Sequence, residues 1–273
     1  MKLKVTFSLL AIAAFLLFIA GCSKSPQPEQ PGKMVIVFQH SVGQAPLELD
    51  TMKYVNAAGN PYMVTEIQYF ISNICLHKAN GDSLLFDNND QNQNIHYVDT
   101  GIPGTWQWQL PDSIPPGEYS AISFTFGLNK KDNVSLRFRN PPESDMFWPQ
   151  YLGGGYHYMK LNGKWRDTAY VVRPFNFHLG IGQLYDDQGN ITGFVQNYFE
   201  VKLPQSSFSI SAGQTVQLFL NMDVNEWFKD PNIYDFNVWG GKIMQNQQAM
   251  HLACQNGHNV FSAKGIKVLL PEK

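Results

Sequence analysis

The seven histidines are the residues of this chain best suited to chemistry, because neutral imidazole is the commonest metal ligand near neutral pH. Period-2 spacing places His157 on one strand face with Met159 and Leu161, where a buried imidazole needs a hydrogen-bond partner or a metal. On the segment 175–180, Asn176 and His178 share the face opposite the phenylalanines. For each histidine, a hydrogen-bonded structural role without a metal is the alternative.

The cysteines offer a second kind of chemistry. Besides Cys22, only Cys75 and Cys254 are present, and in an oxidising compartment two thiols most simply form one disulfide, so we expect these two to pair. His251, Cys254 and His258 recur at helical spacing and resemble half a metal site. We favour the simpler interpretation, a disulfide cysteine flanked by two histidines near the C-terminus of a helix.

Signatures of common enzymes are missing from the sequence. It contains no GxSxG, no HExxH, no P-loop and no GxGxxG after a predicted strand. The formal net charge is −2 and no basic cluster is present to bind nucleic acid. These features predict a binding protein without enzymatic turnover, and they disfavour nucleic acid as a partner.

Tryptophans suggest an alternative function. Trp106, Trp108 and Trp148 lie in aromatic-rich stretches. Such side chains more often fill a core, but an exposed indole can bind a sugar. A glycan- or other ligand-binding protein whose histidines are structural is therefore the second hypothesis, and a purely structural or adhesive domain is the third.

The elements that must position these residues are mostly strands. Alternating apolar residues, often β-branched or aromatic, predict strands in the following segments: 33–39, 64–77, 95–98, 122–128, 156–161, 171–179, 196–203, 216–224 and 264–270. Turn residues separate them, among them Asn162-Gly163, and Ile243, Gln247, Met250 and Cys254 follow a helical spacing. We predict an all-β fold, an antiparallel β-sandwich (Ig-like or partly barrel-like) with one short C-terminal helix.

The N-terminus has the features of a bacterial lipoprotein signal peptide over residues 1–21. Lys2 and Lys4 precede an apolar run over residues 5–20, and small residues precede Cys22. Cys22 is then the lipidated mature N-terminus, which gives a stable membrane anchor. Residues 22–32 read as a polar, Pro-rich linker and residues 33–273 as one domain. We expect a lipoprotein of the outer membrane that faces the periplasm or the cell surface.

Five segments, in their order along the chain, carry a family resemblance. They are residues 35–43 (VIVFQHSVG), 67–74 (IQYFISNI), 96–99 (HYVD), 146–161 and 177–180 (FHLG). Together they resemble the MbnP-like family, the methanobactin-associated copper-binding proteins and their lipoprotein relatives in Bacteroidetes-type bacteria.

This resemblance implies a β-sandwich with a copper site built from two histidines and a tryptophan oxidised to kynurenine. By position the histidines are His178 and His40, with His157 as the substitute, and the tryptophan is Trp148. The resemblance also implies a partner, a dihaem cytochrome c peroxidase-like protein that performs the oxidation. An outer-membrane receptor is a further candidate partner.

Overall fold

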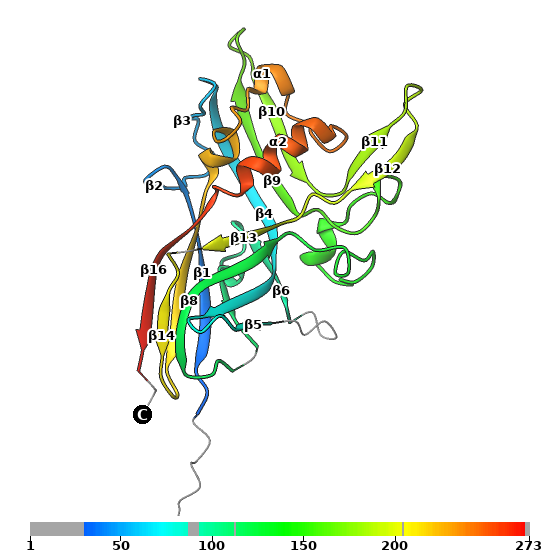
Figure 1. Cartoon of the computed structure of the whole chain (residues 1–273). Coiled ribbons are helices and arrows are strands. Elements are labelled where there is room, and N and C mark those ends of the chain that lie inside the picture. Colours follow the sequence, from blue (N-terminus) through cyan, green and yellow to red (C-terminus); the bar gives the residue numbers. More distant parts are fainter. Residues whose placement is uncertain (1–29, 87–92, 112, 204, 271–273) are drawn as a thin grey trace, which may run out of the picture.

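The computed structural model describes residues 30–86, 93–111, 113–203 and 205–270 (Figure 1). The predicted signal peptide, the lipidation site Cys22 and residues 22–29 of the predicted linker lie outside the described residues. None of the helices in the described part combines the length and apolar character that a membrane crossing requires.

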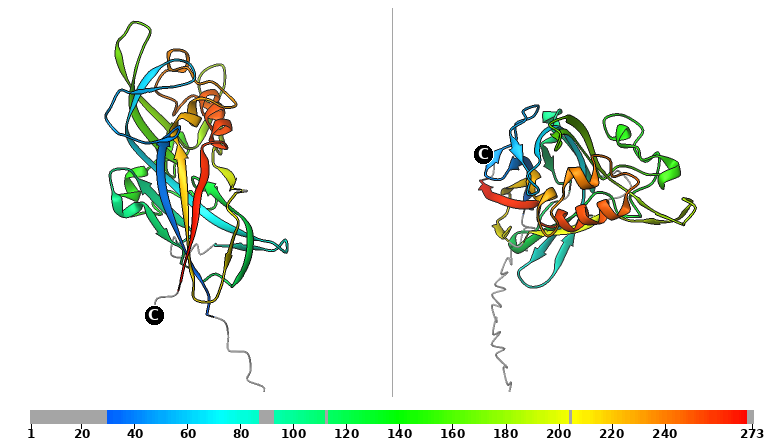
Figure 2. Two further views of the ribbon diagram at one scale, coloured as in Figure 1. Left: turned by 90° about the vertical axis from the view of Figure 1, so that its left-hand side faces the viewer. Right: turned by 90° about the horizontal axis from the view of Figure 1, so that it is seen from above.

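The first sheet contains both ends of the described chain. Its strand order is β16-β15-β1-β2, and β7 also pairs with β1. Its strands are β1 (Lys33–Val42), β2 (Ala45–Pro46), β7 (Gln107–Gln109), β15 (Thr215–Asp223) and β16 (Phe261–Leu269). Figure 2 shows β1, β15 and β16 side by side in blue, yellow and red. The pairing of β1 with β15 is parallel, whereas the other pairings of this sheet are antiparallel.

The second sheet is larger and is built around the long strand β4. Its main order is β10-β9-β4-β8-β13, with shorter strands attached to β4 and β8. Its strands are β3 (Tyr54–Val55), β4 (Pro61–Lys78), β5 (Ser83–Leu85), β6 (Ile95–Asp99), β8 (Gly117–Phe126), β9 (Met159–Arg166), β10 (Val172–Leu179), β13 (Phe199–Leu203) and β14 (Phe208–Ile210). A separate hairpin joins β11 (Gly182–Tyr185) to β12 (Ile191–Val195).

The α-helices are short and lie at one end of the sandwich (Figure 1). The α-helices are α1 (Phe236–Trp239) and α2 (Gln247–Gly257), and the 3-10 helices are η2 (Pro103–Thr105), η3 (Glu143–Met146), η4 (Gln150–Leu152) and η5 (Val224–Phe228). The Asn246 side chain caps α2 by accepting a hydrogen bond from the backbone N–H of Ala249.

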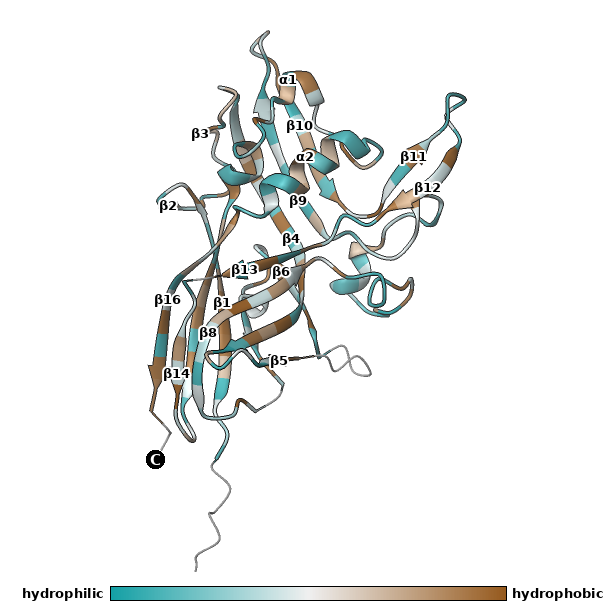
Figure 3. Cartoon of the chain, in the orientation of Figure 1, coloured by the Kyte–Doolittle hydropathy of each residue, from teal (hydrophilic) through white to brown (hydrophobic). Residues whose placement is uncertain are grey.

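Aromatic rings join the inner faces of the two sheets. Phe38 of β1 contacts Tyr69 of β4 with ring centroids 6.3 Å apart, and Phe261 of β16 contacts Phe124 of β8 at 5.3 Å. Alternation along β8 buries Ile122, Phe124 and Phe126 on this inner face, and the bands of Figure 3 follow that pattern. The core therefore lies between the sheets, as burial of alternate strand residues requires.

The predicted all-β sandwich is confirmed, including the helix near the C-terminus. Two details differ. The parallel pairing of β1 with β15 was not expected, because no sequence pattern reports strand order. The predicted turn at Asn162-Gly163 is wrong, because both residues lie inside β9. A Cβ on Gly163 would lie 2.1 Å from the carbonyl oxygen of Met63, so glycine permits the close approach of β4 at that position.

Candidate metal centre

His178 lies near the end of β10 on the outer face of the second sheet. Its cross-strand partner is Lys160 of β9, which in turn pairs with Gln68 of β4. The residues on either side of His178 in β10, Phe177 and Leu179, are buried. Alternation thus places the imidazole opposite the core, beside the polar side chains of β9.

Two hydrogen bonds fix the tautomer of His178. The Asn162 Nδ2 group donates to Glu66 Oε2 at 2.9 Å, which leaves Asn162 Oδ1 as the atom that faces His178. His178 Nε2 lies 2.8 Å from that oxygen and must carry the proton, because an amide oxygen only accepts. Nδ1 of His178 therefore holds a lone pair. This nitrogen is buried and has no hydrogen-bond partner among the residues that the structure describes.

His157 is oriented by the backbone of a neighbouring segment. Its backbone N–H and its Nδ1 both lie within hydrogen-bond distance of the Met146 carbonyl oxygen, at 2.6 Å and 2.9 Å. Since a carbonyl only accepts, Nδ1 carries the proton and Nε2 holds the lone pair. The residue as a whole is buried, with 6% of its surface exposed.

The two imidazoles are in edge-to-face contact. Their ring centroids lie 5.1 Å apart with the ring planes at 84°. Metal–nitrogen bonds of about 2 Å each let two such rings share one ion. A buried nitrogen without a partner costs about 1–3 kcal/mol, so the lone pair of His178 Nδ1 is an argument for an absent ligand. The residues present thus fit a metal ion bound by one nitrogen from each ring.

Electrostatics keep both rings neutral and ready to bind. Burial lowers the pKa of His178 to about 3, and the neighbouring His157 and Lys160 add to that shift. Burial also lowers the pKa of His157 to about 4, partly opposed by its hydrogen bond to the Met146 carbonyl. At neutral pH protons therefore compete little for the two lone pairs.

Trp148 packs against this pair and is fully buried. Its ring centroid lies 4.6 Å from that of His157 in an edge-to-face arrangement, and its Nε1 donates to the Leu152 carbonyl oxygen at 3.0 Å. Gly180, which ends the FHLG segment, permits this packing because a Cβ there would lie 2.6 Å from the indole. Trp148 is therefore the tryptophan in contact with the histidine pair.

Structure and sequence disagree on the face occupied by His157. The expected alternation with Met159 and Leu161 does not extend to it, because β9 begins at Met159. Met159 lies opposite Tyr69 and Leu179 on the inner face, whereas His157 contacts His178 on the outer face. The break in the strand brings the two histidines together.

His40 does not join the pair. It lies on β1 in the other sheet, and its Nε2 is 3.2 Å from the hydroxyl of Tyr69, which points between the sheets. Because His178 lies on the opposite face of the second sheet, β4 separates the two histidines. The assignment of His40 to the metal site is therefore wrong, and His157 takes its place.

The predicted disulfide is also wrong. Both Cys75 and Cys254 are free thiols. Cys75 lies opposite Ser123 on the outer face of the second sheet, whereas α2 packs against Phe199, which pairs with the inward-facing Phe126. Cys254 instead donates to the Asn197 carbonyl oxygen at 3.3 Å, and burial raises its pKa to about 12. A sheet thus lies between the two sulfurs.

Three residues of the site escaped the sequence analysis: Asn162, Glu66 and Met146. Asn162 and Glu66 act through cross-strand register, and Met146 acts through its backbone carbonyl. One usable signal was present. Lys160, Asn162 and Lys164 alternate with Leu161 and Gly163, which marks a strand with one polar face.

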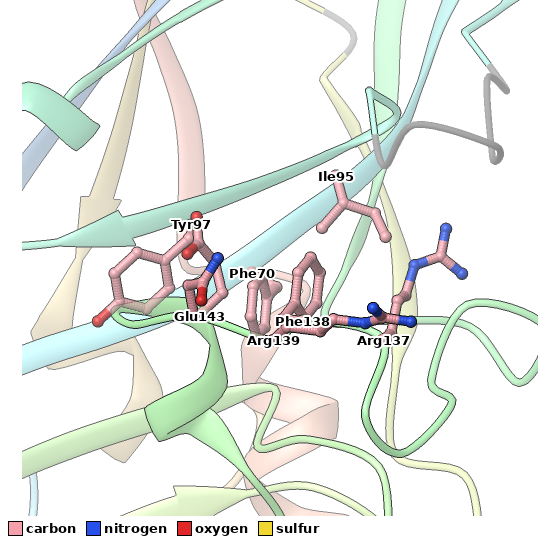
Figure 4. Close-up of a pocket in the computed structure, with 8 residues that line it drawn as sticks. Phe70, Ile95, Tyr97, Arg137, Phe138, Arg139 and Glu143 are labelled. Atoms are coloured by element: carbon pink, nitrogen blue, oxygen red, sulfur yellow. The ribbon is translucent and has the colours of Figure 1, made fainter.

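Another cavity, with no histidine in its lining, lies between Phe70, Tyr97, Phe138 and two arginines (Figure 4). Phe70 and Phe138 stack with centroids 5.3 Å apart. The Arg137 guanidinium lies 3.4 Å from the Asp132 carboxylate. Its charge is therefore matched within the protein.

Within the described residues, no three His, Cys, Asp or Glu side chains converge as a metal cluster. The histidine pair thus stands as a two-nitrogen site. Its chemistry is that of neutral imidazole ligands beside an indole.

Comparison with known proteins identifies the family of this chain. A family model described as MbnP matches residues 31–249. Among solved structures, MbnP from Methylosinus trichosporium is similar at 15% sequence identity, over 74% of this chain and 79% of that chain, with a TM-score of 0.48. No match was found among curated proteins. Since the family model spans well over half of its length, the chain belongs to the MbnP family.

Proposed function

We propose that this protein binds one copper ion between His157 Nε2 and His178 Nδ1, and holds it for buffering or delivery outside the cytoplasm. The observation that carries the proposal is the buried Nδ1 of His178, which has no hydrogen-bond partner among the described residues and belongs to a ring in contact with a second imidazole. His178 Nε2 and His157 Nδ1 each donate to an oxygen acceptor, and these two hydrogen bonds fix the tautomers of the rings. The arrangement supports a ligand pair without a catalytic group.

The donor set favours copper over other metals. Imidazole suits copper, and the affinity of nitrogen ligands for divalent metals of the first row peaks at Cu(II). Magnesium and calcium prefer carboxylate and carbonyl oxygens, and structural zinc sites use four ligands rich in cysteine. Two neutral nitrogens add no negative charge to compensate a hard cation, which further disfavours those ions.

Trp148 is the residue we propose for oxidation to kynurenine. The indole lies edge-on to His157 and is shielded from water, so an oxidising equivalent delivered at the metal site would reach it first. Oxidation of the indole consumes two molecules of hydrogen peroxide. Each molecule delivers one oxygen atom to the indole double bond, and its remaining atoms leave as water. Hydrolysis then releases formate. A dihaem cytochrome c peroxidase-like partner would consume that peroxide and pass its oxidising equivalents to the indole.

The location we propose rests on the N-terminal sequence. Lys2, Lys4 and the apolar run that ends before Cys22 support lipidation and anchoring at the outer membrane. Such a protein could pass copper to or from an outer-membrane receptor.

The test is metal analysis of protein purified without a His-tag, followed by titration with Cu(I) and Cu(II) against a chromogenic chelator. We expect one ion per chain, and loss of tight binding in His157→Ala and His178→Ala. The matched control is His251→Ala, an exposed histidine on α2, which should bind copper as the wild type does. Stoichiometric copper that survives both site substitutions would overturn the proposal.

Oxidation of Trp148 is tested separately by intact mass after co-expression with a dihaem peroxidase. Loss of one carbon and gain of one oxygen, mapped to the peptide that holds Trp148, is expected. The same mass change in Trp148→Phe would place the modification elsewhere.

A further inference from the structure

A pocket of about 840 Å³ lies on the first sheet, whereas His178 lies on the second sheet. It is bordered by β1, the turn into β2, the start of β7 and the neighbouring strands β15 and β16. The volume falls within the range of small-molecule sites. His40 and Trp106, which are not part of the candidate metal centre, both line this pocket.

Trp106 forms a rigid platform at the edge of this pocket. Its Nε1 donates to the Asp99 carbonyl oxygen at 2.7 Å, and its own carbonyl oxygen accepts from the Phe38 N–H at 2.9 Å. The indole is nevertheless 39% exposed and has no aromatic ring partner among the described residues. Trp108 and Trp148, by contrast, are 7% and 0% exposed. Of these three tryptophans, Trp106 alone is exposed, and the hydrogen bond of its Nε1 holds the indole in one orientation.

Amide side chains surround the platform. Gln39 and Gln107 lie on the outer face of the sheet beside Val37, since Val37 pairs with Gln107 across β1 and β7. Gln44 follows in the turn after β1. Within the part of the chain that the structure describes, these three amides make no side-chain hydrogen bond to protein. Each therefore keeps two N–H donors and a carbonyl acceptor for a ligand.

The floor of the pocket is polar as well. Asn221 is paired with Gln39 in the parallel register and is 3% exposed. Its Nδ2 donates to Ser41 Oγ at 2.9 Å, so its Oδ1 remains as an acceptor. Lys264 adds a single cation, and no carboxylate is among the residues that line the pocket. The site thus combines many neutral donors and acceptors with little charge.

We propose that this pocket binds a neutral pyranose unit of a glycan, with its C–H face on Trp106 and its hydroxyls on Gln39, Gln107 and Asn221. A pyranose has one apolar face and a rim of hydroxyl groups that both donate and accept. Open indole and amide groups match these two features separately. The lining has no carboxylate to bind a cation and only Lys264 to bind a polyanion. The charges of the pocket therefore favour an uncharged sugar.

This site is independent of the copper site. The two lie on different sheets, and the sugar contacts involve neither His157 nor His178. Sugar binding can therefore fail while copper binding holds, and the reverse.

The experiment titrates the full-length protein with five probes, cellohexaose, xylohexaose, maltohexaose, mannohexaose and chitohexaose, by isothermal calorimetry. We expect at least one to bind with a submillimolar Kd. Trp106→Ala should weaken that binding about tenfold, and Trp106→Phe should weaken it less because a ring face remains. Gln107→Ala changes an exposed residue and should weaken binding about threefold without affecting the fold.

Controls separate this site from other surfaces. Tyr170→Ala removes an aromatic ring that is 82% exposed but does not line the pocket, and should leave the Kd unchanged. His178→Ala should also leave it unchanged. Failure of all five probes to bind would overturn the proposal, as would binding that is indifferent to Trp106→Ala and Gln107→Ala. Selective binding of uronic-acid oligosaccharides that disappears in Lys264→Met would overturn the neutral assignment.

Discussion

Asn162 is the residue through which the proposed copper site can be tested most sharply without touching a ligand. Its Oδ1 accepts the proton of His178 Nε2 at 2.8 Å, and its Nδ2 donates to Glu66 Oε2 at 2.9 Å. Replacing it by alanine removes the acceptor that directs the His178 proton to Nε2. The lone pair is then free to move away from Nδ1, the nitrogen that we propose as the copper ligand.

The size of the effect follows from the two hydrogen bonds. Loss of an outer partner of a ligating histidine typically weakens metal binding by about 10- to 100-fold. This corresponds to about 1.4–2.8 kcal/mol. Because Glu66 also loses its partner, we expect the free energy of unfolding to fall by about 1–3 kcal/mol as well.

The assay compares copper affinity in Asn162→Ala and Asn176→Ala by competition with a chromogenic chelator. Asn176 is the matched control, because it pairs directly with Asn162 across the strands but is exposed and makes no side-chain hydrogen bond within the described residues. Nitrogen-15 NMR of the copper-free protein should show protonated Nε2 at His178 in the wild type and in the control. Equal copper affinity in the two variants, with an unchanged His178 tautomer, would refute the reasoning.

Three further predictions concern the fold around the site. Gly180→Ala should lower the free energy of unfolding by about 1–3 kcal/mol, because the new Cβ would lie 2.6 Å from the Trp148 ring. Thermal unfolding should show the loss in comparison with Gly265→Ala, where nothing lies within 4 Å of the new Cβ. An equal Tm in both variants would contradict the close packing. His96 stacks between Phe38 and Trp108, and burial lowers its pKa to about 4. Between pH 6.5 and about 4, His96 is therefore protonated in the unfolded chain and neutral in the folded protein. The free energy of unfolding contributed by neutral His96 is complete above pH 6.5, and it falls by up to about 1.4 kcal/mol per pH unit on acidification. Urea midpoints at pH 7 and pH 5 should differ less in His96→Phe than in the wild type, and an identical difference would argue against this origin. Finally, Cys75 and Cys254 should both react with a thiol reagent in denaturant without prior reduction, whereas protection of both would restore the disulfide.

Prediction from sequence succeeded where local pattern decides the outcome. Alternating residues identified β8 and β15, and the polar pair Asn176 and His178 was found on the correct face of β10. Trp148 followed from the family resemblance, and the structure places it against His157.

The failures share one cause, which is the order of strands in space. His40 was paired with His178 from the family resemblance, and Cys75 was paired with Cys254 from thiol chemistry, but each lies on a different side of the second sheet from its expected partner. His157 was assigned to the wrong face because the strand begins two residues later. Asn162 was taken for a turn residue because Gly163 follows it, although that glycine serves a close contact between strands.

The parallel pairing of β1 with β15 has a consequence for how the chain reaches its native state. Ser41 and Asn221, joined by a side-chain hydrogen bond across this pair, are 180 positions apart. Strand β1 thus pairs with a strand that is synthesised late, because β15 begins only at Thr215. Such a large sequence separation between contacting residues slows folding, because the entropy of closing the loop is lost before the stabilising contacts form. A nascent chain therefore cannot pair β1 with β15 until most of its length has been synthesised.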